Sequence, residues 1–138
     1  MKNLIKKHAE KLRFGAVGVV NTALDFGILF VLVKVFKFST IGGNYISTSI
    51  ALVFSFFANK KFTFKNNDKT QARQFIVFLA ITLVGLWIIQ PLIISGIEYI
   101  ISGFALNSSF KLIIEKLFAT VASLIWNYLM YRKFVFNK

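Results

Sequence analysis

Four long apolar stretches, separated by short polar segments, constrain most strongly what this chain can fold into. The first begins at Phe14 and ends near Phe36, and Asp25 and Lys34 are the only charged residues that interrupt it. An α-helix rises about 1.5 Å per residue, so about 20 apolar residues cross a hydrocarbon core about 30 Å thick. We therefore expect an all-α, polytopic membrane protein with four transmembrane helices in a single domain over residues 1–138. The helices are predicted at about residues 14–36, 41–58, 75–101 and 112–131.

Composition leads to the same class and argues against catalysis. Hydrophobic residues make up 57% of the chain and charged residues 16%, a balance that a soluble domain of 138 residues cannot cover with polar surface. The chain has no cysteine, one histidine and five acidic residues, which excludes a disulfide and leaves few metal ligands. No carboxylate pair, nucleophile–base pair or metal cluster is recognisable. We expect neither an enzyme nor a bound cofactor or metal.

The third stretch contains the only proline of the chain, Pro91. Proline lacks a backbone N–H and its ring clashes with the preceding turn, so a bend is predicted about two-thirds of the way across this helix. Gln90 is placed to bond the carbonyls that such a bend frees.

Thirteen of the seventeen Lys and Arg residues fall at the two termini and in the middle loop. Five lie in the segment through Arg13, five in residues 60–73 and three between Arg132 and Lys138. Because these residues concentrate on the cytoplasmic side of membrane proteins, we expect both termini and the middle loop in the cytoplasm. The N-terminal segment is either such a flank or a basic amphipathic helix lying on an anionic leaflet.

A ten-residue unit occurs twice, at the ends of the second and fourth stretches. The copies are Ser55–Phe64, here called the first tail, and Asn127–Phe136, the second tail. Their overlay sets Lys60-Lys61 on Arg132-Lys133, Phe62 on Phe134, Phe64 on Phe136, Ser55 on Asn127 and Asn59 on Tyr131. Each half holds two spans, so the halves enter the membrane in the same direction. We expect two hairpins related as a parallel repeat.

Two sequence features carry a resemblance to a known family. The first span opens with Arg13-Phe14-x3-Gly18-x2-Asn21-x3-Asp25, and the basic-aromatic tail is duplicated. With four short spans and basic cytoplasmic ends, the chain resembles the GtrA-like family of small bacterial membrane proteins over nearly its whole length. It departs from the usual tail of that family at four positions. Ser55 and Tyr131 replace asparagines, and Phe62 and Phe134 replace tryptophans.

The resemblance implies a role in cell-envelope polysaccharide modification. A member of this family is expected to be a flippase that moves a polyprenyl (undecaprenyl)-phosphate-linked monosaccharide from the cytoplasmic to the outer leaflet of the bacterial cytoplasmic membrane. The expected partners are the lipid-linked sugar and the membrane glycosyltransferases that act before and after it, and nucleic acid is not among them. The sugar would then modify a polymer such as O-antigen, teichoic acid or arabinogalactan.

The chemistry of such a cargo indicates the candidate binding residues. An anionic phosphate needs cations at the entry leaflet, and a sugar needs hydrogen-bonding groups within the span. We expect these groups to be Asn21, Asp25, Asn59, Lys60, Lys61, Asn127, Arg132 and Lys133. For the cations, the alternative is that they only satisfy the positive-inside rule and complement the helix dipole.

Asp25 is the most informative single residue. It lies eleven residues after Phe14, about 16 Å into the membrane, where an acid costs about 2.5–3.5 kcal/mol on insertion scales. Its side chain should therefore face the interior of the bundle, with Asn21 one turn away on the same face. Asp25 is either a sugar-hydroxyl acceptor or proton-coupling carboxylate, or it forms a structural hydrogen bond between helices. The structural partners considered are Ser47, Thr48 and Ser55.

Two other functions fit parts of the pattern. A small proton-coupled multidrug exporter also carries an acid in its first helix, but the cytoplasmic cations here favour an anionic cargo. A non-transporting scaffold that recruits a glycosyltransferase would use the same polar stripe and cations for protein contacts. Because four short helices enclose little space, we expect a homodimer or larger homo-oligomer.

Overall fold

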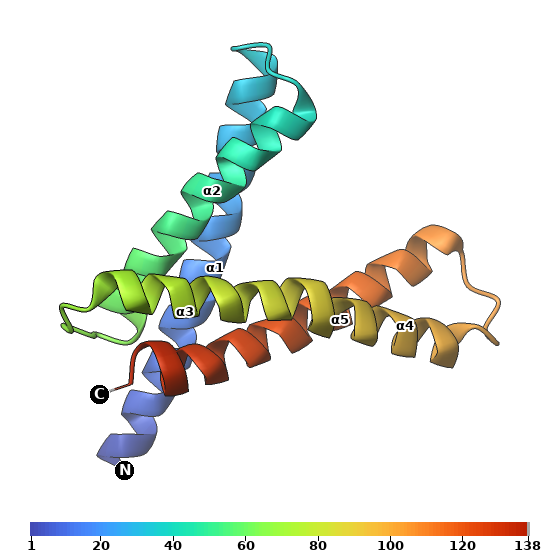
Figure 1. Cartoon of the computed structure of the whole chain (residues 1–138). Helices are drawn as coiled ribbons and strands as arrows, with labels where there is room; N and C mark the ends of the chain where they lie inside the picture. The colour runs from blue at the N-terminus through green and yellow to red at the C-terminus, as the bar shows by residue number, and fades with distance from the viewer. Residues whose placement is uncertain (138) are drawn as a thin grey trace. The chain divides into compact units, whose positions relative to one another are not determined.

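The computed structural model describes residues 1–137, which form helices, turns and loops without a β-strand. Four helical segments in this range are long and apolar enough to cross a membrane, as the all-α prediction requires. Lys138, counted above among the C-terminal cations, lies outside the described residues. The elements are α1 (Lys2–Lys34), α2 (Thr40–Ala58), η1 (Asn59–Thr63), α3 (Gln71–Val84), η2 (Gly85–Ile89), α4 (Gln90–Ile101), α5 (Ser108–Met130) and η3 (Tyr131–Val135), where η marks a π-helical turn (Figure 1).

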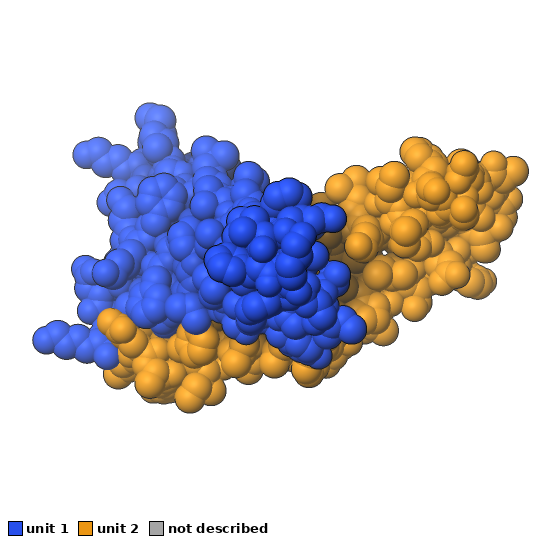
Figure 2. Space-filling model, turned by 90° about the horizontal axis from the view of Figure 1, so that it is seen from above, with its two compact units in different colours: residues 1–69, 138 blue, residues 70–137 orange. Residues whose placement is uncertain are grey.

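The chain divides into two compact units of similar length (Figure 2). Unit 1 comprises residues 1–69, in which α1 packs along α2 and η1. Unit 2 comprises residues 70–137, in which α3 packs against η3, and η2 and α4 pack along α5. Each unit therefore holds two of the four candidate spans. The parallel repeat and the cytoplasmic position of both termini stay predictions.

Helix α1 begins twelve residues earlier than the first predicted span and includes the basic N-terminal segment. Lys, Leu, Ala and Glu favour helix, and no Gly or Pro occurs before Gly15, so nothing in this segment ends the helix. The 33 residues of α1 correspond to about 50 Å, well beyond the thickness of a hydrocarbon core. Lys37, with φ of 59°, lies in the left-handed region just after the helix.

In unit 1, α1 and α2 lie very close together near the loop that joins them. Ser39 caps α2 by accepting a hydrogen bond from the backbone N–H of Gly42 at 3.1 Å. One residue on, a Cβ on Gly43 would lie 3.2 Å from Leu29 and 3.3 Å from Val33 of α1. The helices can approach this closely because Gly43 has no side chain.

In unit 2, the distortion next to Pro91 takes the form of the π-helical turn η2. The backbone N–H of Gln90 bonds the carbonyl of Gly85, five residues back. This wider turn stands immediately before the proline, which cannot donate to the helix. The side chain of Gln90 donates a hydrogen bond to Ser123 Oγ of α5 at 2.9 Å, so it joins α4 to α5.

The same positions are buried in α2 with its tail and in α5 with its tail. When the two tails are overlaid, most buried residues of α2 and its tail fall on buried residues of α5 and its tail, with Lys60 and Gly43 as exceptions. The pairs are Ser47 with Ala119, Ala51 with Ser123, Phe56 with Tyr128, Thr63 with Val135 and Phe64 with Phe136.

Candidate functional site

Both tails form the same local structure, a π-helical turn that holds the paired cations. In the first tail the backbone N–H of Phe64 bonds the carbonyl of Asn59 at 2.9 Å. In the second tail Phe136 bonds Tyr131 in the same way at 2.8 Å. The final phenylalanine of each tail is buried. The turn therefore anchors each tail in its own unit.

The four tail cations differ in exposure. Lys61, Arg132 and Lys133 are exposed, and the Nζ of Lys133 lies 5.2 Å from the centroid of the Phe134 ring. Lys60 is only 2% exposed, and its Nζ donates a hydrogen bond to the main-chain carbonyl of Asp68. The structure thus leaves three of these side chains at the surface and turns the fourth inward.

The loop after the first tail folds back over Lys60. The backbone N–H of Asn66 bonds the carbonyl of Lys60 at 2.8 Å, and the Asn66 side chain accepts from the N–H of Asp68 at 3.0 Å. Asn66 is itself buried. Lys60 therefore holds the connector that leads to α3. The side chain of Lys61 is exposed.

Asn59 is satisfied at both ends of its amide. Its Nδ2 donates to the carbonyl of Ser55 at 2.9 Å and to Ser55 Oγ at 3.2 Å, while its Oδ1 accepts from Thr63 Oγ1 at 3.0 Å. These bonds lie within the α2–η1 helix. Asn59 thus stabilises the first tail from within.

Arg13, which the sequence indicated as a flanking cation and as the start of the family motif, links α1 to the first tail. Its Nη2 and Nε donate to the carbonyl of Thr63 at 3.2 and 3.4 Å. The neighbouring Phe14 lies 6.5 Å from Phe64, measured between ring centroids. The signal in the sequence was the cation directly before an aromatic residue at the start of the span.

Tyr131 connects α3 to the second tail. Its hydroxyl lies 2.5 Å from Thr82 Oγ1, and its ring stacks on Phe78 at 4.5 Å between centroids. Trp126 of α5 donates from Nε1 to the carbonyl of Ile81 at 3.1 Å. Sequence reasoning did not identify these links, although Thr82 was visible as a polar residue inside an apolar stretch.

Three of the predicted site residues carry a buried oxygen that lacks a hydrogen-bond partner among the described residues. The oxygens are Oδ1 of Asn21, of Asp25 and of Asn127. Ser47, one structural partner considered for Asp25, instead donates to the carbonyl of Asn44 at 3.2 Å. An unsatisfied buried polar atom costs about 1–3 kcal/mol, so these positions are expensive for folding alone.

Asn127 packs against η2, the π-helical turn that follows α3. A Cβ built on Gly85 would lie 3.0 Å from Asn127 Oδ1 and 3.3 Å from Trp126 Cδ1. The oxygen of Asn127 therefore faces the backbone of Gly85.

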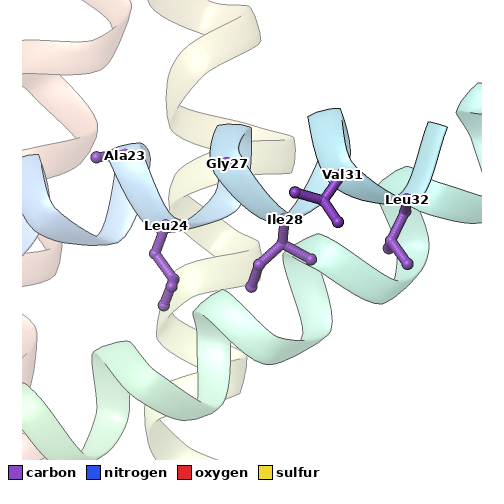
Figure 3. A pocket seen from close by; sticks show the side chains of 6 residues that line it. All are labelled: Ala23, Leu24, Gly27, Ile28, Val31 and Leu32. Atoms are coloured by element: carbon purple, nitrogen blue, oxygen red, sulfur yellow. The ribbon is translucent and has the colours of Figure 1, made fainter. Parts of the chain in front are cut away.

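A shallow apolar hollow of about 450 Å³ runs along the second half of α1. Figure 3 shows its lining, with Leu24, Ile28 and Leu32 in a row along one side of the helix. Ala23, Gly27 and Val31 complete it, and Asp25 is not part of it. Such a surface suits hydrocarbon chains and offers no polar contact.

Within residues 1–137, no three His, Cys, Asp or Glu side chains come together in a way that could hold a metal ion. The polar groups of the candidate site are instead asparagine amides, one carboxylate and cations.

Comparison with known proteins identifies one family model that matches most of the chain. The family model described as "GtrA/DPMS, transmembrane domain" matches residues 13–136. The chain is 29% identical over 125 residues to the uncharacterised membrane protein YngA of Bacillus subtilis (strain 168), a match that covers 91% of this chain and 78% of that protein. No solved structure matches the chain.

Proposed function

Because the chain belongs to the GtrA/DPMS transmembrane-domain family, we propose that it is a flippase for a polyprenyl-phosphate-linked monosaccharide. It is a multi-pass membrane protein in a family associated with lipid-linked sugars. In this proposal the protein works in the bacterial cytoplasmic membrane and carries its cargo from the cytoplasmic to the outer leaflet. The sugar then serves the glycosylation of an envelope polymer, for example teichoic acid. No bond is made or broken by the protein.

The unpartnered oxygens of Asn21 and Asp25 are the observation that carries the proposal. A sugar headgroup loses its water when it crosses about 30 Å of hydrocarbon, and it needs replacement hydrogen bonds along the path. Asn21 and Asp25 are one helical turn apart on α1 and both hold an acceptor without a partner among the described residues. A residue that is costly for folding and unused by the fold is the kind that membrane proteins retain for function.

The phosphate is proposed to bind at the exposed cations of either tail, which gives one candidate phosphate site in each unit. Lys61, Arg132 and Lys133 offer charge-assisted hydrogen bonds to an anion, and the π-helical turns hold them at the ends of α2 and α5. Lys60 and Asn59 contribute by fixing the first tail, through Asp68 and through Ser55 with Thr63. The prenyl chain remains in the surrounding lipid.

The proposed partners follow from this reaction. A membrane glycosyltransferase on the cytoplasmic side must make the lipid-linked sugar, and a second one on the outer side must consume it. A second copy of the chain is proposed to help enclose the polar path.

The test is a transport assay in liposomes. Purified protein is reconstituted with undecaprenyl-phosphate-linked glucose, galactose or N-acetylglucosamine, and the rate at which each lipid becomes accessible from the opposite leaflet is measured. We expect acceleration for at least one sugar. The triple variant Lys61→Gln, Arg132→Gln, Lys133→Gln should abolish it, because both tails lose the exposed cations that are proposed to bind a phosphate.

A matched control removes the same number of charges elsewhere. The triple variant Lys2→Gln, Lys6→Gln, Lys7→Gln changes exposed residues of the N-terminal segment and should retain the transport rate. Equal transport by both triple variants would refute the phosphate site. A folded protein that accelerates none of the three sugars would refute the flippase and favour the scaffold, to be followed by a search for a bound glycosyltransferase.

A further inference from the structure

The repeat can be followed from the tails into the preceding helices. Arg13-Phe14 corresponds to Gln74-Phe75, and continuing at the same spacing pairs Val17 with Phe78. Val17 is 5% exposed and Phe78 is 1% exposed, so this spacing sets a buried residue on a buried residue. One turn further it pairs Asn21 with Thr82, and after another turn Asp25 with Leu86. The side chains of these two pairs determine which unit has polar groups that could bind a ligand.

In unit 2 the polar side chain of the first pair, Thr82, is hydrogen-bonded within the protein. Thr82 Oγ1 donates to the carbonyl of Phe78 at 2.8 Å and lies 2.5 Å from the hydroxyl of Tyr131. Thr82 is 8% exposed and Tyr131 is 3% exposed. At the Asp25 position this unit has the apolar Leu86. No acceptor at these two positions of unit 2 is left without a partner.

In unit 1 the corresponding contact is missing. Asn59 takes the place of Tyr131, but its short side chain bonds Ser55 and Thr63 within its own helix. Asn21 Oδ1 and Asp25 Oδ1 are left without a partner among the described residues. The remaining unpartnered oxygen, on Asn127 of unit 2, faces the backbone of Gly85.

We propose that the two units have different tasks, with unit 1 binding the hydroxyl groups of the cargo headgroup through Asn21 and Asp25, and unit 2 closed at the matching position by the Thr82–Tyr131 contact. This rests on the proposed function and specifies its site. Two acceptors one turn apart, with Cβ atoms about 5–6 Å from each other, match a ligand that presents neighbouring hydroxyl donors. The bound class is therefore a sugar headgroup with at least two free hydroxyl groups.

The test measures binding separately from transport. The thermal unfolding of purified protein is followed in a detergent without a sugar headgroup, with increasing amounts of undecaprenyl-phosphate-linked glucose, galactose or N-acetylglucosamine. Asn21→Leu and Asp25→Leu remove the unit 1 acceptors and keep the branching and the number of side-chain heavy atoms. Thr82→Val and Tyr131→Phe break the unit 2 contact and serve as matched controls.

We expect opposite behaviour from the two pairs of variants. Asn21→Leu and Asp25→Leu should unfold at or above the wild-type temperature, because each removes an unsatisfied buried oxygen, and each should bind the lipid about tenfold or more weakly. Thr82→Val and Tyr131→Phe should unfold at a lower temperature, because a buried hydrogen bond is lost, yet bind within about twofold of wild type.

The outcomes separate this inference from the proposed function. Binding that survives in both unit 1 variants, or that is lost equally in the unit 2 variants, overturns the division of tasks even if the wild type transports. If none of the three lipids stabilises the wild type, the division of tasks is overturned as well. The liposome assay then tests the flippase activity independently. Binding that needs Asn21 and Asp25 in a protein that transports nothing upholds the site and refutes the flippase.

Discussion

At the scale of single residues, Arg13 shows how a predicted flanking cation becomes part of the fold. Its guanidinium donates to the carbonyl of Thr63 at the end of the first tail. The last carbonyls of a helix have no partner within the helix, so a cation there supplies a missing bond and complements the helix dipole. Arg13 is also one of the cations that predict the topology. Because that role explains its charge, nothing in the sequence separately indicated its contact with Thr63.

Arg13→Gln should destabilise unit 1 by about 1 kcal/mol, because the shorter neutral side chain cannot reach the Thr63 carbonyl with a charged donor. Lys11→Gln removes an equal charge from an exposed position two residues earlier and should change the stability by less than about 0.5 kcal/mol. Unfolding in mixed micelles with increasing SDS measures both. Equal losses would mean that Arg13 acts only through its charge.

The sequence singled out individual residues only where polarity alone was informative, and the binding role of those residues stays a prediction. Asn21 and Asp25 stood out because they interrupt an apolar stretch, and both carry an oxygen without a partner among the described residues. The burial of Lys60 and the contact between Thr82 and Tyr131 depend on how far a side chain reaches and on where a loop folds. Neither is encoded in hydrophobic periodicity.

At the scale of elements, the two tails were recognised as a repeat, but their π-helical turns were not predicted. A π-helical turn has the same hydrophobic residues as an α-helix and differs only in which carbonyl each N–H reaches. Helix ends were also misjudged, most of all for α1, whose basic first turns favour helix although they are polar. Hydropathy identifies the part of a helix that fits the membrane and not the part that continues beyond it.

Proteolysis of the connector between the units tests whether Lys60 holds this loop in place. Lys60→Met should make residues 64–70 about tenfold more susceptible to trypsin, because the loss of a charged hydrogen bond to Asp68 lets the loop open. Cleavage after Lys65 or Lys69 is followed by mass spectrometry. Lys61→Met, one residue along and exposed, is the control and should be cut at the wild-type rate. Equal protection of both variants would mean that Lys60 does not hold the loop.

The packing of α1 on α2 gives a second prediction at this scale. Gly43→Leu should destabilise unit 1 by about 1–3 kcal/mol, because its side chain would enter the space of Leu29 and Val33. Gly27→Leu is the matched control, since no described atom lies within 4 Å of a Cβ at that position. SDS-induced unfolding of the two variants should therefore differ clearly. A similar tolerance at both glycines would contradict the close approach.

At the scale of the whole molecule, the orientation in the membrane rests on the distribution of cations. Because the chain has no cysteine, single cysteines can be introduced without background. Cysteines at positions 2, 67 and 137 should be protected from a membrane-impermeant maleimide added outside intact cells, and one at position 104 should react. Labelling of position 67 together with 104 would refute four spans. Labelling of only 2, 67 and 137 would reverse the orientation.

The number of spans and the all-α class could be predicted from the sequence, because about 20 apolar residues have few alternatives to a transmembrane helix. The internal order of each unit also followed partly, since the repeated tails align buried positions in α2 and α5. What holds each unit together did not follow. It lies in contacts between helices, such as Gly43 with α1 and Gln90 with Ser123, which depend on three-dimensional packing.

Because α1 is one continuous helix from Lys2 to Lys34, its N-terminal segment must move together with the part of the helix that spans the membrane. If the span begins near Phe14, the twelve residues before it extend about 18 Å beyond the bilayer core as a continuation of the same rod. A tilt of the span by about 30° would then displace the tip by about 9 Å, by the geometry of a rigid helix. Movements inside the membrane thereby become large displacements in water, where a fluorophore on residue 2 would register them.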